Sequence, residues 1–275
     1  GSWVAALAGT NQEAELRESC EKLRAMGIDL EWKDAAEVRR ASGSAALGGG
    51  IFQPRDGGLD PVRLCRGLAR AIVGLGGEVR TGVRVRALEP AGDRVRLLSD
   101  AGTIVAGRAV LTTNGYIPQL VPALAAEIRP VRAQMLATAP GPRILRGVWY
   151  VNDGYEYFRQ LPDGTFLLGG CRWTCRDTEV GFLETPTGAV QGALEQFLRD
   201  ALPAFADRPI VQRWAGTMAL TPDGLRRTGE VPGLPAVLYG VGCNGHGMST
   251  GFVTGRELAE RAAGERVADG SSELS

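Results

Sequence analysis

Histidine is almost absent from this 275-residue chain, whose one histidine is His246. A Ser-His-Asp or Cys-His hydrolase would have to use this residue, which lies in a glycine-rich turn. The sequence also lacks the G-x-S-x-G nucleophile motif and the G-x-x-x-x-G-K-[ST] phosphate-binding loop. Enzymes with so little histidine often leave the chemistry to a bound cofactor, and we therefore expect cofactor chemistry here.

Cysteine is sparse and irregularly spaced. Its five positions are 20, 65, 171, 175 and 243. An odd number at irregular spacing argues against a disulfide framework in a chain of this size. Cys171 and Cys175 stand four residues apart, but one histidine cannot easily complete a zinc site with them. We expect a reduced, cytoplasmic protein without a bound metal.

No excess of either charge is present, since Lys+Arg and Asp+Glu both number 31 and arginine supplies almost all of the positive charge. This balance predicts no general attraction to nucleic acid or to an anionic membrane. No apolar run approaches the length of about 20 residues that spans a bilayer. The first residues also lack the basic and apolar pattern of a signal peptide. The sequence therefore favours neither a nucleic acid nor a membrane as the partner.

The first part of the chain predicts helices separated by loops. Residues 12–26 have the periodicity of an amphipathic helix, and Asp34 with Glu37 forms a capping-box pattern before a second helix. Residues 41–58 are rich in glycine and serine and predict a loop. Pro61 is expected to open a third helix. Its core-facing residues would be Leu64, Leu68, Ala69 and Ile72.

Strand patterns dominate the remainder. Alternation predicts a strand over 79–87, and the apolar run 109–111 suits a strand buried on both faces. Residues 128–222 predict an antiparallel sheet with one helix at 188–201. A buried strand at 236–239 then leads to a helix at 248–263. Its inward residues would be Met248, Phe252, Leu258 and Ala262, and Gly251 and Gly255 would allow a close neighbour.

These patterns predict an α+β or α/β fold in which a mixed-sheet domain is split by an inserted antiparallel domain. The expected division is a helical segment and loop over 1–58, one split domain formed by 59–120 and 236–264, the inserted domain over 128–222, and a polar tail at 265–275.

A glycine-rich segment, residues 240–247, joins the last strand to the last helix and satisfies G-x-G-x-x-G. Its position suits a dinucleotide fingerprint, but no further strand with an acidic residue follows. Alternatively, the helix amino terminus faces a partly anionic ring such as the N1–C2=O edge of reduced flavin. A glycine-rich turn without a ligand is the third interpretation.

Several segments in a specific order resemble the FAD-dependent amine and amino-acid oxidase family, which includes D-amino-acid, glycine and sarcosine oxidases. They are Gly57-Gly58-Leu59-Asp60-Pro61, Val79 to Leu88, Val110-Leu111-Thr112-Thr113-Asn114, Ile128-Arg129-Pro130-Val131, Trp214-Ala215-Gly216, Thr221-Pro222-Asp223-Gly224 and the closing glycine segment with its helix. Tyr155-x-Tyr157-x-Arg159, followed by Asp163-Gly164 and Leu168-Gly169-Gly170, looks most similar to the gamma-glutamylputrescine oxidase-like branch.

The resemblance implies a two-domain flavoprotein fold: a mixed-sheet FAD-binding domain and an antiparallel substrate domain. It places the Val85 backbone near the adenine and Thr113-Asn114 near the middle of non-covalent FAD. The flavin ring and ribityl chain would lie along Gly242, Cys243, Asn244, Gly245, His246, Gly247, Met248 and Ser249. The implied substrate residues are Tyr155, Tyr157, Arg172, Trp214 and Met218; simple packing is the alternative role for the aromatic ones.

Three departures from the family pattern bear on function. The family opens with a strand and a G-x-G-x-x-G turn for the ADP half of FAD, and no such segment precedes residue 40. We therefore expect a truncated fold with weakened FAD affinity. Met218 stands where glycine oxidase-like members place a carboxylate-binding arginine, which favours an amine over a simple α-amino acid. Thr217 stands near the flavin-linking cysteine of sarcosine oxidases, so no covalent link is expected.

The leading functional hypothesis is an FAD-dependent oxidoreductase, or its carboxyl-terminal portion, that oxidises the C–N bond of an amine or amino acid by hydride transfer to flavin. No side chain need act as a strong base. His246 would either tune the flavin, contact substrate or serve only as a loop residue. The alternatives are a non-catalytic module and one half of a two-chain enzyme. An apolar patch where the missing strand belongs would favour a partner chain or a homo-oligomer.

Overall fold

The computed structural model describes residues 1–264, which form two compact units. Unit 1 contains Gly1–Asp60, Arg132–Glu179 and Leu183–Gly216. Unit 2 contains Pro61–Val131, Val180–Phe182 and the described chain from Thr217 onward. The predicted tail at 265–275 lies outside the described residues. Within the described part, no helix is both long and apolar enough to cross a bilayer.

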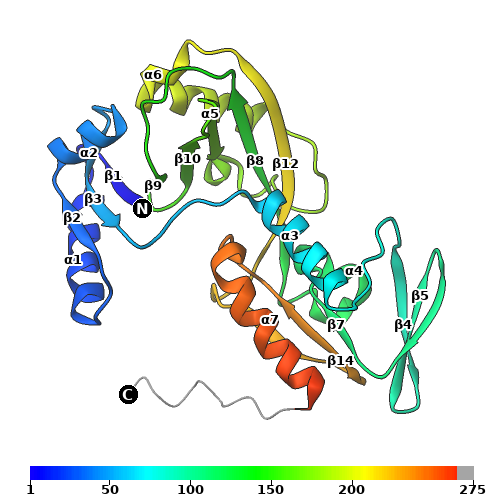
Figure 1. The fold of residues 1–275 in the computed structure, drawn as a ribbon. Coiled ribbons are helices and arrows are strands. Elements are labelled where there is room, and N and C mark those ends of the chain that lie inside the picture. Colours follow the sequence, from blue (N-terminus) through cyan, green and yellow to red (C-terminus); the bar gives the residue numbers. More distant parts are fainter. Residues whose placement is uncertain (265–275) are drawn as a thin grey trace. The chain divides into compact units, whose positions relative to one another are not determined.

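Unit 1 is built on an eight-stranded mixed sheet with the order β12-β8-β11-β10-β9-β1-β3-β2 (Figure 1). The strands are β1 (Ser2–Leu7), β2 (Glu31–Lys33), β3 (Leu47–Gln53), β8 (Arg129–Thr138), β9 (Val148–Val151), β10 (Glu156–Gln160), β11 (Phe166–Gly170) and β12 (Ile210–Leu220). β1 is parallel to β9, while β9, β10, β11 and β8 pair antiparallel. β8 begins, and β12 ends, in unit 2.

Helices cover this sheet because strand side chains alternate between its two faces. One face packs against α2 (Ala35–Ser42), α5 (Gly188–Ala201) and α6 (Pro203–Ala206), and its core includes stacked Trp149 and Phe158. On the other face, α1 (Gln12–Ala25) covers Ile51 and Val4 through Cys20. Side chains on the two faces of β1 therefore belong to two separate hydrophobic cores.

The glycine-rich segment expected to be a loop contains β3, so that expectation is wrong for 47–53. A Cβ at Gly49 would lie 2.7 Å from the Trp32 ring, and one at Gly50 would lie 2.9 Å from the Ala5 backbone. Neighbouring elements approach too closely for any side chain there. Gly49 and Gly50 are thus strand residues that neighbouring elements contact closely. The prediction of a loop was wrong because it rested on glycine content alone.

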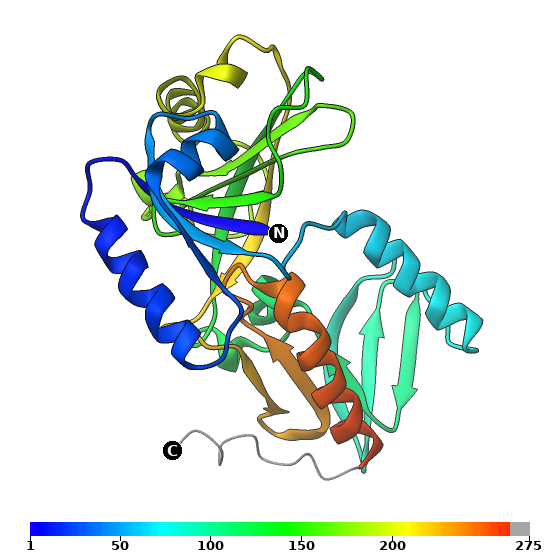
Figure 2. The same cartoon turned by 60° about the vertical axis from the view of Figure 1, so that its left-hand side comes forward.

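Unit 2 contains two three-stranded sheets, β13-β14-β7 and β4-β5-β6. Its elements are α3 (Pro61–Gly74), β4 (Val85–Ala91), β5 (Arg94–Ser99), β6 (Gly102–Ala106), β7 (Ala109–Leu111), α4 (Ile117–Leu120), β13 (Arg227–Val231), β14 (Leu234–Val241) and α7 (Gly247–Ala263). β14 pairs antiparallel with β13 and parallel with β7. Figure 2 shows α7 lying along β14.

The close approach of α7 to β14 occurs at Gly240, where a Cβ would lie 2.5 Å from Leu258 Cδ1. The expectation that Gly251 and Gly255 provide it is wrong, because no atom of the described residues lies within 4 Å of a Cβ at either position. Leu258 is buried as predicted, but Met248 and Phe252 are exposed.

Further sequence expectations fail in unit 2. The strand begins at Val85 rather than 79, since its partner β5 ends at Ser99 and Gly82 adopts a φ of +71°. β7 is covered on one side only, and Val110 is 40% exposed. α3 starts at Pro61 as predicted, yet its expected core residues are not buried; Leu68 and Ile72 are 42% and 46% exposed.

Most of the predicted elements are confirmed. The helix at 188–201 has the predicted bounds, and the stretch 128–222 contains strands, at 129–138, 148–151, 156–160, 166–170 and 210–220, as predicted. Asp34 and Glu37 form the predicted capping box, with both reciprocal hydrogen bonds present. The mixed α/β class with smaller antiparallel sheets also agrees with the prediction.

Shortening Leu194 tests the packing of unit 1. This side chain is fully buried on α5, so Leu194→Ala should lower the free energy of unfolding by about 2–5 kcal/mol. Urea denaturation followed by tryptophan fluorescence measures it, because all five tryptophans belong to unit 1. Leu183→Ala, at a position 72% exposed, is the matched control and should change stability by under about 0.5 kcal/mol. Equal effects of the two changes would contradict the assigned core.

Candidate functional site

The glycine segment 240–247 forms a tight turn between β14 and α7. Gly242 and Gly245 have φ values of +77° and +85°, a region that side-chain-bearing residues rarely enter. With Gly240 packed beneath α7, local structure explains three of the glycines. The conformation of the turn and its packing therefore account for most of the glycine motif. A ligand would interact with the backbone N–H groups that the turn does not use itself.

Asn114 ties this turn to the end of β7. Its Oδ1 accepts hydrogen bonds from the backbone N–H groups of Gly242, at 3.1 Å, and Cys243, at 3.3 Å. Asn114 has a φ of +44°, which asparagine tolerates better than most residues. β7 and β14 are parallel, so their carboxyl ends meet here. The structure thus brings Thr113 and Asn114 together with the glycine turn.

Two kinds of polar group in this place lack partners. The Thr113 hydroxyl is buried without a hydrogen bond. At the start of α7 the carbonyl of His246 accepts from the N–H groups of Ser249 and Thr250, whereas those of Gly247 and Met248 find no acceptor among the described residues. The first turn of α7 also carries no acidic residue. These N–H groups suit an oxygen acceptor or partial negative charge.

The other residues predicted to contact the cofactor belong to the glycine turn, to the start of α7 and to β4. Asn244 Oδ1 accepts from the Thr221 N–H, and His246 Nδ1 donates to the Asn244 carbonyl at 2.9 Å, which leaves Nε2 available. Ser249 Oγ donates to the His246 carbonyl, and burial raises the pKa of the Cys243 thiol. Val85 lies elsewhere in unit 2, at the start of β4 opposite Ser99.

In unit 1 a row of side chains crosses the sheet face opposite α5. Tyr150, Tyr157, Gly169 and Met135 are cross-strand neighbours on β9, β10, β11 and β8. A Cβ at Gly169 would collide with the Tyr157 ring, so this glycine creates the space in which the ring lies. Burial, with a smaller effect of Tyr150, raises the pKa of Tyr157 to about 12. Tyr157 is therefore a neutral hydroxyl at neutral pH.

The other substrate candidates of unit 1 surround this row. Arg172 lies near enough to Tyr157 for its charge to oppose the pKa rise. Tyr155 precedes β10 and receives a hydrogen bond from Arg176, whose guanidinium also stacks 5.1 Å from its ring. Trp214 follows Arg213, which binds α5, and alternation therefore turns Trp214 to the opposite face.

Met218 belongs to unit 2. It lies farther along β12, where its carbonyl oxygen would be 2.9 Å from a Cβ at Gly115.

Sequence reasoning missed two residues of this face, Tyr150 and Arg159. Arg159 Nη1 donates to the Leu59 carbonyl at 2.6 Å, and a Cβ at Gly58 would lie 2.7 Å from Val148 Cγ2. The Gly57–Pro61 motif therefore rests on β9 and β10. The signal was present in Tyr157-x-Arg159, since residues two apart on a strand share a face, but only the register identifies Tyr150.

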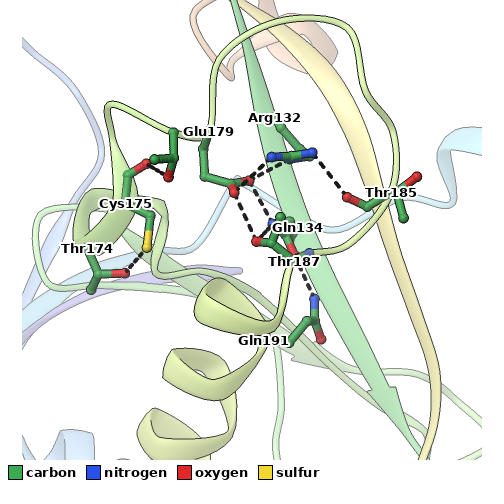
Figure 3. A network of polar contacts seen from close by, with 9 residues as sticks. Arg132, Gln134, Thr174, Cys175, Glu179, Thr185, Thr187 and Gln191 are labelled. Atoms are coloured by element: carbon green, nitrogen blue, oxygen red, sulfur yellow. Dashed lines mark hydrogen bonds and ion pairs between the residues drawn. The ribbon is translucent and has the colours of Figure 1, made fainter.

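A buried polar network holds the opposite face of β8 to the chain before α5 (Figure 3). Arg132 pairs with Glu179 at 2.7 and 3.0 Å, and Gln134 donates to Glu179 at 2.7 Å. Thr187 donates to the same carboxylate, and Gln191 of α5 donates to Gln134. Burial alone would raise the pKa of Glu179, but hydrogen bonds from Arg132, Gln134 and Thr187 lower it overall. The network anchors the segment that carries Arg172.

Replacing Asn114 tests the connection between the two strand ends. In Asn114→Ala the N–H groups of Gly242 and Cys243 lose their acceptor, and alanine must adopt a φ of +44°. We expect hydrogen exchange at both amides to accelerate by about tenfold, the equivalent of one hydrogen bond. Asn114→Asp keeps the acceptor oxygen and should restore slow exchange. Unchanged exchange in Asn114→Ala would contradict the interaction.

The lowered pKa of Glu179 predicts how stability depends on pH. A folded-state pKa below the ordinary value of about 4.3 means that the ionised pair stabilises above that value and loses its effect as pH falls through the folded pKa. Wild-type stability should therefore fall from about pH 5 downward, by more than in Glu179→Gln. Glu195→Gln, which removes a half-exposed partner of Arg213, is the control. Identical pH profiles for wild type and Glu179→Gln would contradict the assignment.

Comparison with known proteins places these features in a family. The family model described as FAD dependent oxidoreductase (DAO) matches residues 1–261. The "Probable oxidoreductase OrdL" of Rhizobium meliloti is 30% identical over 242 residues, which cover 86% of this chain and 54% of that protein. Glycine oxidase of Bacillus licheniformis is 28% identical over 90% of this chain and 67% of its own length. The chain thus spans about half the length of OrdL.

Solved structures agree on the fold. Glycine oxidase from Geobacillus kaustophilus superposes with a TM-score of 0.85 at 20% identity, covering 97% of this chain and 72% of that one. L-proline dehydrogenase from P. horikoshii gives 0.83, also at 20% identity. The fold predicted from the order of the motifs is therefore confirmed. With its family model matched over residues 1–261, the chain belongs to the DAO family of FAD dependent oxidoreductases.

Proposed function

We propose that this chain contributes the flavin-contacting and substrate-binding parts of an enzyme that oxidises the C–N bond of an amine or amino acid with FAD. The observation that carries the proposal is the pair of N–H groups at Gly247 and Met248, which find no acceptor among the described residues. They follow a turn that Asn114 holds through Gly242 and Cys243. Family membership supports the redox class. The chain covers only 54% of OrdL, so the activity of a whole enzyme is part of the proposal.

The residues of the glycine turn fit the flavin part of FAD. Thr113 offers a buried hydroxyl without a partner, and the turn between Gly242 and Gly247 presents backbone rather than side chains. The N–H groups at the start of α7 would hold a flavin carbonyl oxygen and the negative charge near it. His246, with Nε2 free, and Ser249 would lie beside it; Val85 is proposed for the adenine end. FAD, when bound, supplies the acceptor for the hydride removed beside nitrogen.

We assign the substrate to the sheet face of Tyr157 in unit 1. A neutral tyrosine hydroxyl can orient an amine nitrogen or a carbonyl by hydrogen bonding without adding charge. Arg172 adds positive charge near it, while Tyr155 and Trp214 provide aromatic surface. Their role is to position a neutral amine and to exclude water, which requires no strong base. Met218 cannot form a bidentate pair with a carboxylate, which favours an amine over a simple α-amino acid.

A partner chain that supplies the rest of the cofactor site is the second candidate. Relatives of this chain include "Hydrogen cyanide synthase subunit HcnC" of Pseudomonas aeruginosa, named as a subunit, and the bifunctional ThiO/ThiG of Synechocystis. The observation that favours it here is α3, a helix without a buried residue. Alternatively, the exposed surface of α3 would contact a second copy of this chain in a homo-oligomer.

Visible absorption of the purified chain, before and after FAD addition and desalting, tests the cofactor proposal. We expect retained flavin absorption, and about tenfold weaker FAD binding in Asn114→Ala because the turn loses its support. Asn11→Ala, at an exposed position in unit 1, is the control and should bind FAD as wild type does. A colourless wild-type protein that never holds flavin would exclude this chain alone as the enzyme.

Tyr157→Phe tests the substrate face. Loss of one hydrogen bond should raise the amine concentration for half-maximal flavin reduction by about tenfold, while FAD binding stays unchanged. Rapid mixing under anaerobic conditions with a set of amines and amino acids measures both. Tyr239→Phe, on β14 in unit 2, is the matched control. The assignment is wrong if Tyr157→Phe and Tyr239→Phe give the same curves.

A further inference from the structure

A buried carboxylate begins strand β10 of unit 1. Glu156 lies between Tyr155 and Tyr157, but alternation turns its side chain to the buried face, where it is 1% exposed. Its oxygens accept hydrogen bonds from Trp173 Nε1 at 2.7 Å and from Asn152 Nδ2 at 2.8 Å, and the Cys171 thiol forms a third contact. None of these three partners is a cation.

This arrangement differs from the other buried carboxylate of unit 1. Glu179 pairs with the guanidinium of Arg132, whereas Glu156 is held by neutral donors. Burying a carboxylate without a charged partner costs free energy of folding, because neutral hydrogen bonds do not fully replace its hydration. Cys171, which contacts this carboxylate, also has a φ of +55°, in the left-handed region. Such costs are typical of places that serve binding or catalysis.

The residue that Glu156 holds is an exposed aromatic ring. Trp173 belongs to the 3-10 helix η3 (Arg172–Cys175), which follows β11. Its indole N–H is fixed by Glu156, yet the residue is 46% exposed, and its ring lies 6.5 Å from the ring of Tyr155, which is 40% exposed. A large apolar ring that is oriented by a hydrogen bond and open to solvent is suited to contact a ligand. We call Trp173 and Tyr155 the aromatic wall.

The aromatic wall adjoins the sheet face assigned to the substrate. Tyr155 precedes Tyr157 by two residues, and Arg172 lies close enough to Tyr157 for its charge to act on the pKa of that tyrosine. Beyond η3, the N–H of Glu179 donates to the Cys175 carbonyl at 3.0 Å, and the Glu179 side chain enters the network of Figure 3. The segment that carries the wall is therefore fixed at two points, at Glu156 and at Glu179.

The charges around the wall indicate what it would bind. The Arg176 guanidinium lies 5.1 Å from the Tyr155 ring and donates to its hydroxyl, and Arg172 is part of the same segment. The Glu156 carboxylate is buried and bonded to the indole N–H. Two guanidinium groups would repel a second ammonium group of a ligand, whereas an alkyl chain would lose contact with water against the two rings.

We propose that Glu156 positions Trp173 so that the aromatic wall binds the alkyl arm of a monoamine substrate. The inference rests on the proposed function and names its substrate class, an amine with an apolar arm rather than a diamine. Trp173 is the binding residue, and Glu156 acts through it as a positioning residue.

Fluorine NMR of the chain labelled with fluorotryptophan, without added FAD, tests the proposal. The chain has five tryptophans, and Trp173→Phe assigns the signal of Trp173. Titration with ethylamine, butylamine and hexylamine should shift this signal, and the dissociation constant should fall by about fourfold for each CH₂ group that the wall covers. The signal of Trp32, on β2 of the same unit, is the internal control and should not shift.

Variants then test the positioning role, with dissociation constants measured by titration calorimetry. Glu156→Ala removes the acceptor of the indole N–H and should weaken hexylamine binding by about tenfold, and Trp173→Phe, which lacks the N–H donor, should do the same. Glu156→Gln keeps an acceptor oxygen and should bind hexylamine within about threefold of wild type. Trp32→Phe is the matched control and should leave binding unchanged. If Glu156→Ala does not fold, Trp173→Phe provides the same test at a half-exposed ring.

The outcomes separate this inference from the proposed function because the titrations need no flavin. A Trp173 signal that does not move, equal hexylamine binding in wild type and Trp173→Phe, or tighter binding of diaminobutane than of butylamine would each overturn the inference. Flavin reduction by amines with an unmoved Trp173 signal would do so as well and leave the proposed function standing. A Trp173 signal that shifts with hexylamine in a chain that never retains FAD would support the inference and contradict the cofactor proposal.

Discussion

The hydrogen bonds from Gly242 and Cys243 to the Asn114 side chain hold the candidate cofactor site in one place. They join the carboxyl ends of two parallel strands, β7 and β14, from distant parts of the chain. Because the turn is held there, α7 begins at a defined point, and two of its N–H groups find no acceptor among the described residues. The glycines permit this path, Gly242 through its positive φ and Gly240 through close contact with α7. The proposed chemistry thus depends on backbone geometry more than on reactive side chains.

The alternation of its strands gives the sheet of unit 1 one face packed against helices and one face to which we assign substrate binding. On one face, stacked aromatic rings and the network around Glu179 fasten the sheet to α5. On the opposite face, Tyr150 pairs with Tyr157, whose ring lies in the space that Gly169 provides on β11. A change on the first face should therefore act on folding, and a change on the second face should act on the proposed substrate binding.

Periodicity and capping were sufficient to predict most elements, because those signals act within a few residues. The helix at 188–201 and the capping box at Asp34 illustrate this. Prediction failed where packing overrode local preference. The glycines of β3 were mistaken for a loop because only Trp32 and Ala5, which pack against them, explain their strand. For α3 the predicted helix is correct, but its apolar side chains are not buried among the described residues, because burial depends on contacts with distant segments that no local pattern specifies.

The sequence by itself determined the family and fold class, since the order of short motifs survives in a chain about 30% identical to its relatives. It also located the glycine turn and the helix that follows it. Only the tertiary structure decided that Asn114 supports this turn, that Tyr150 and Arg159 share a face with Tyr157, and that no residue of α3 is buried among the described residues. These features depend on strand register and on contacts between distant segments, and neither is encoded in the spacing of residues along the chain.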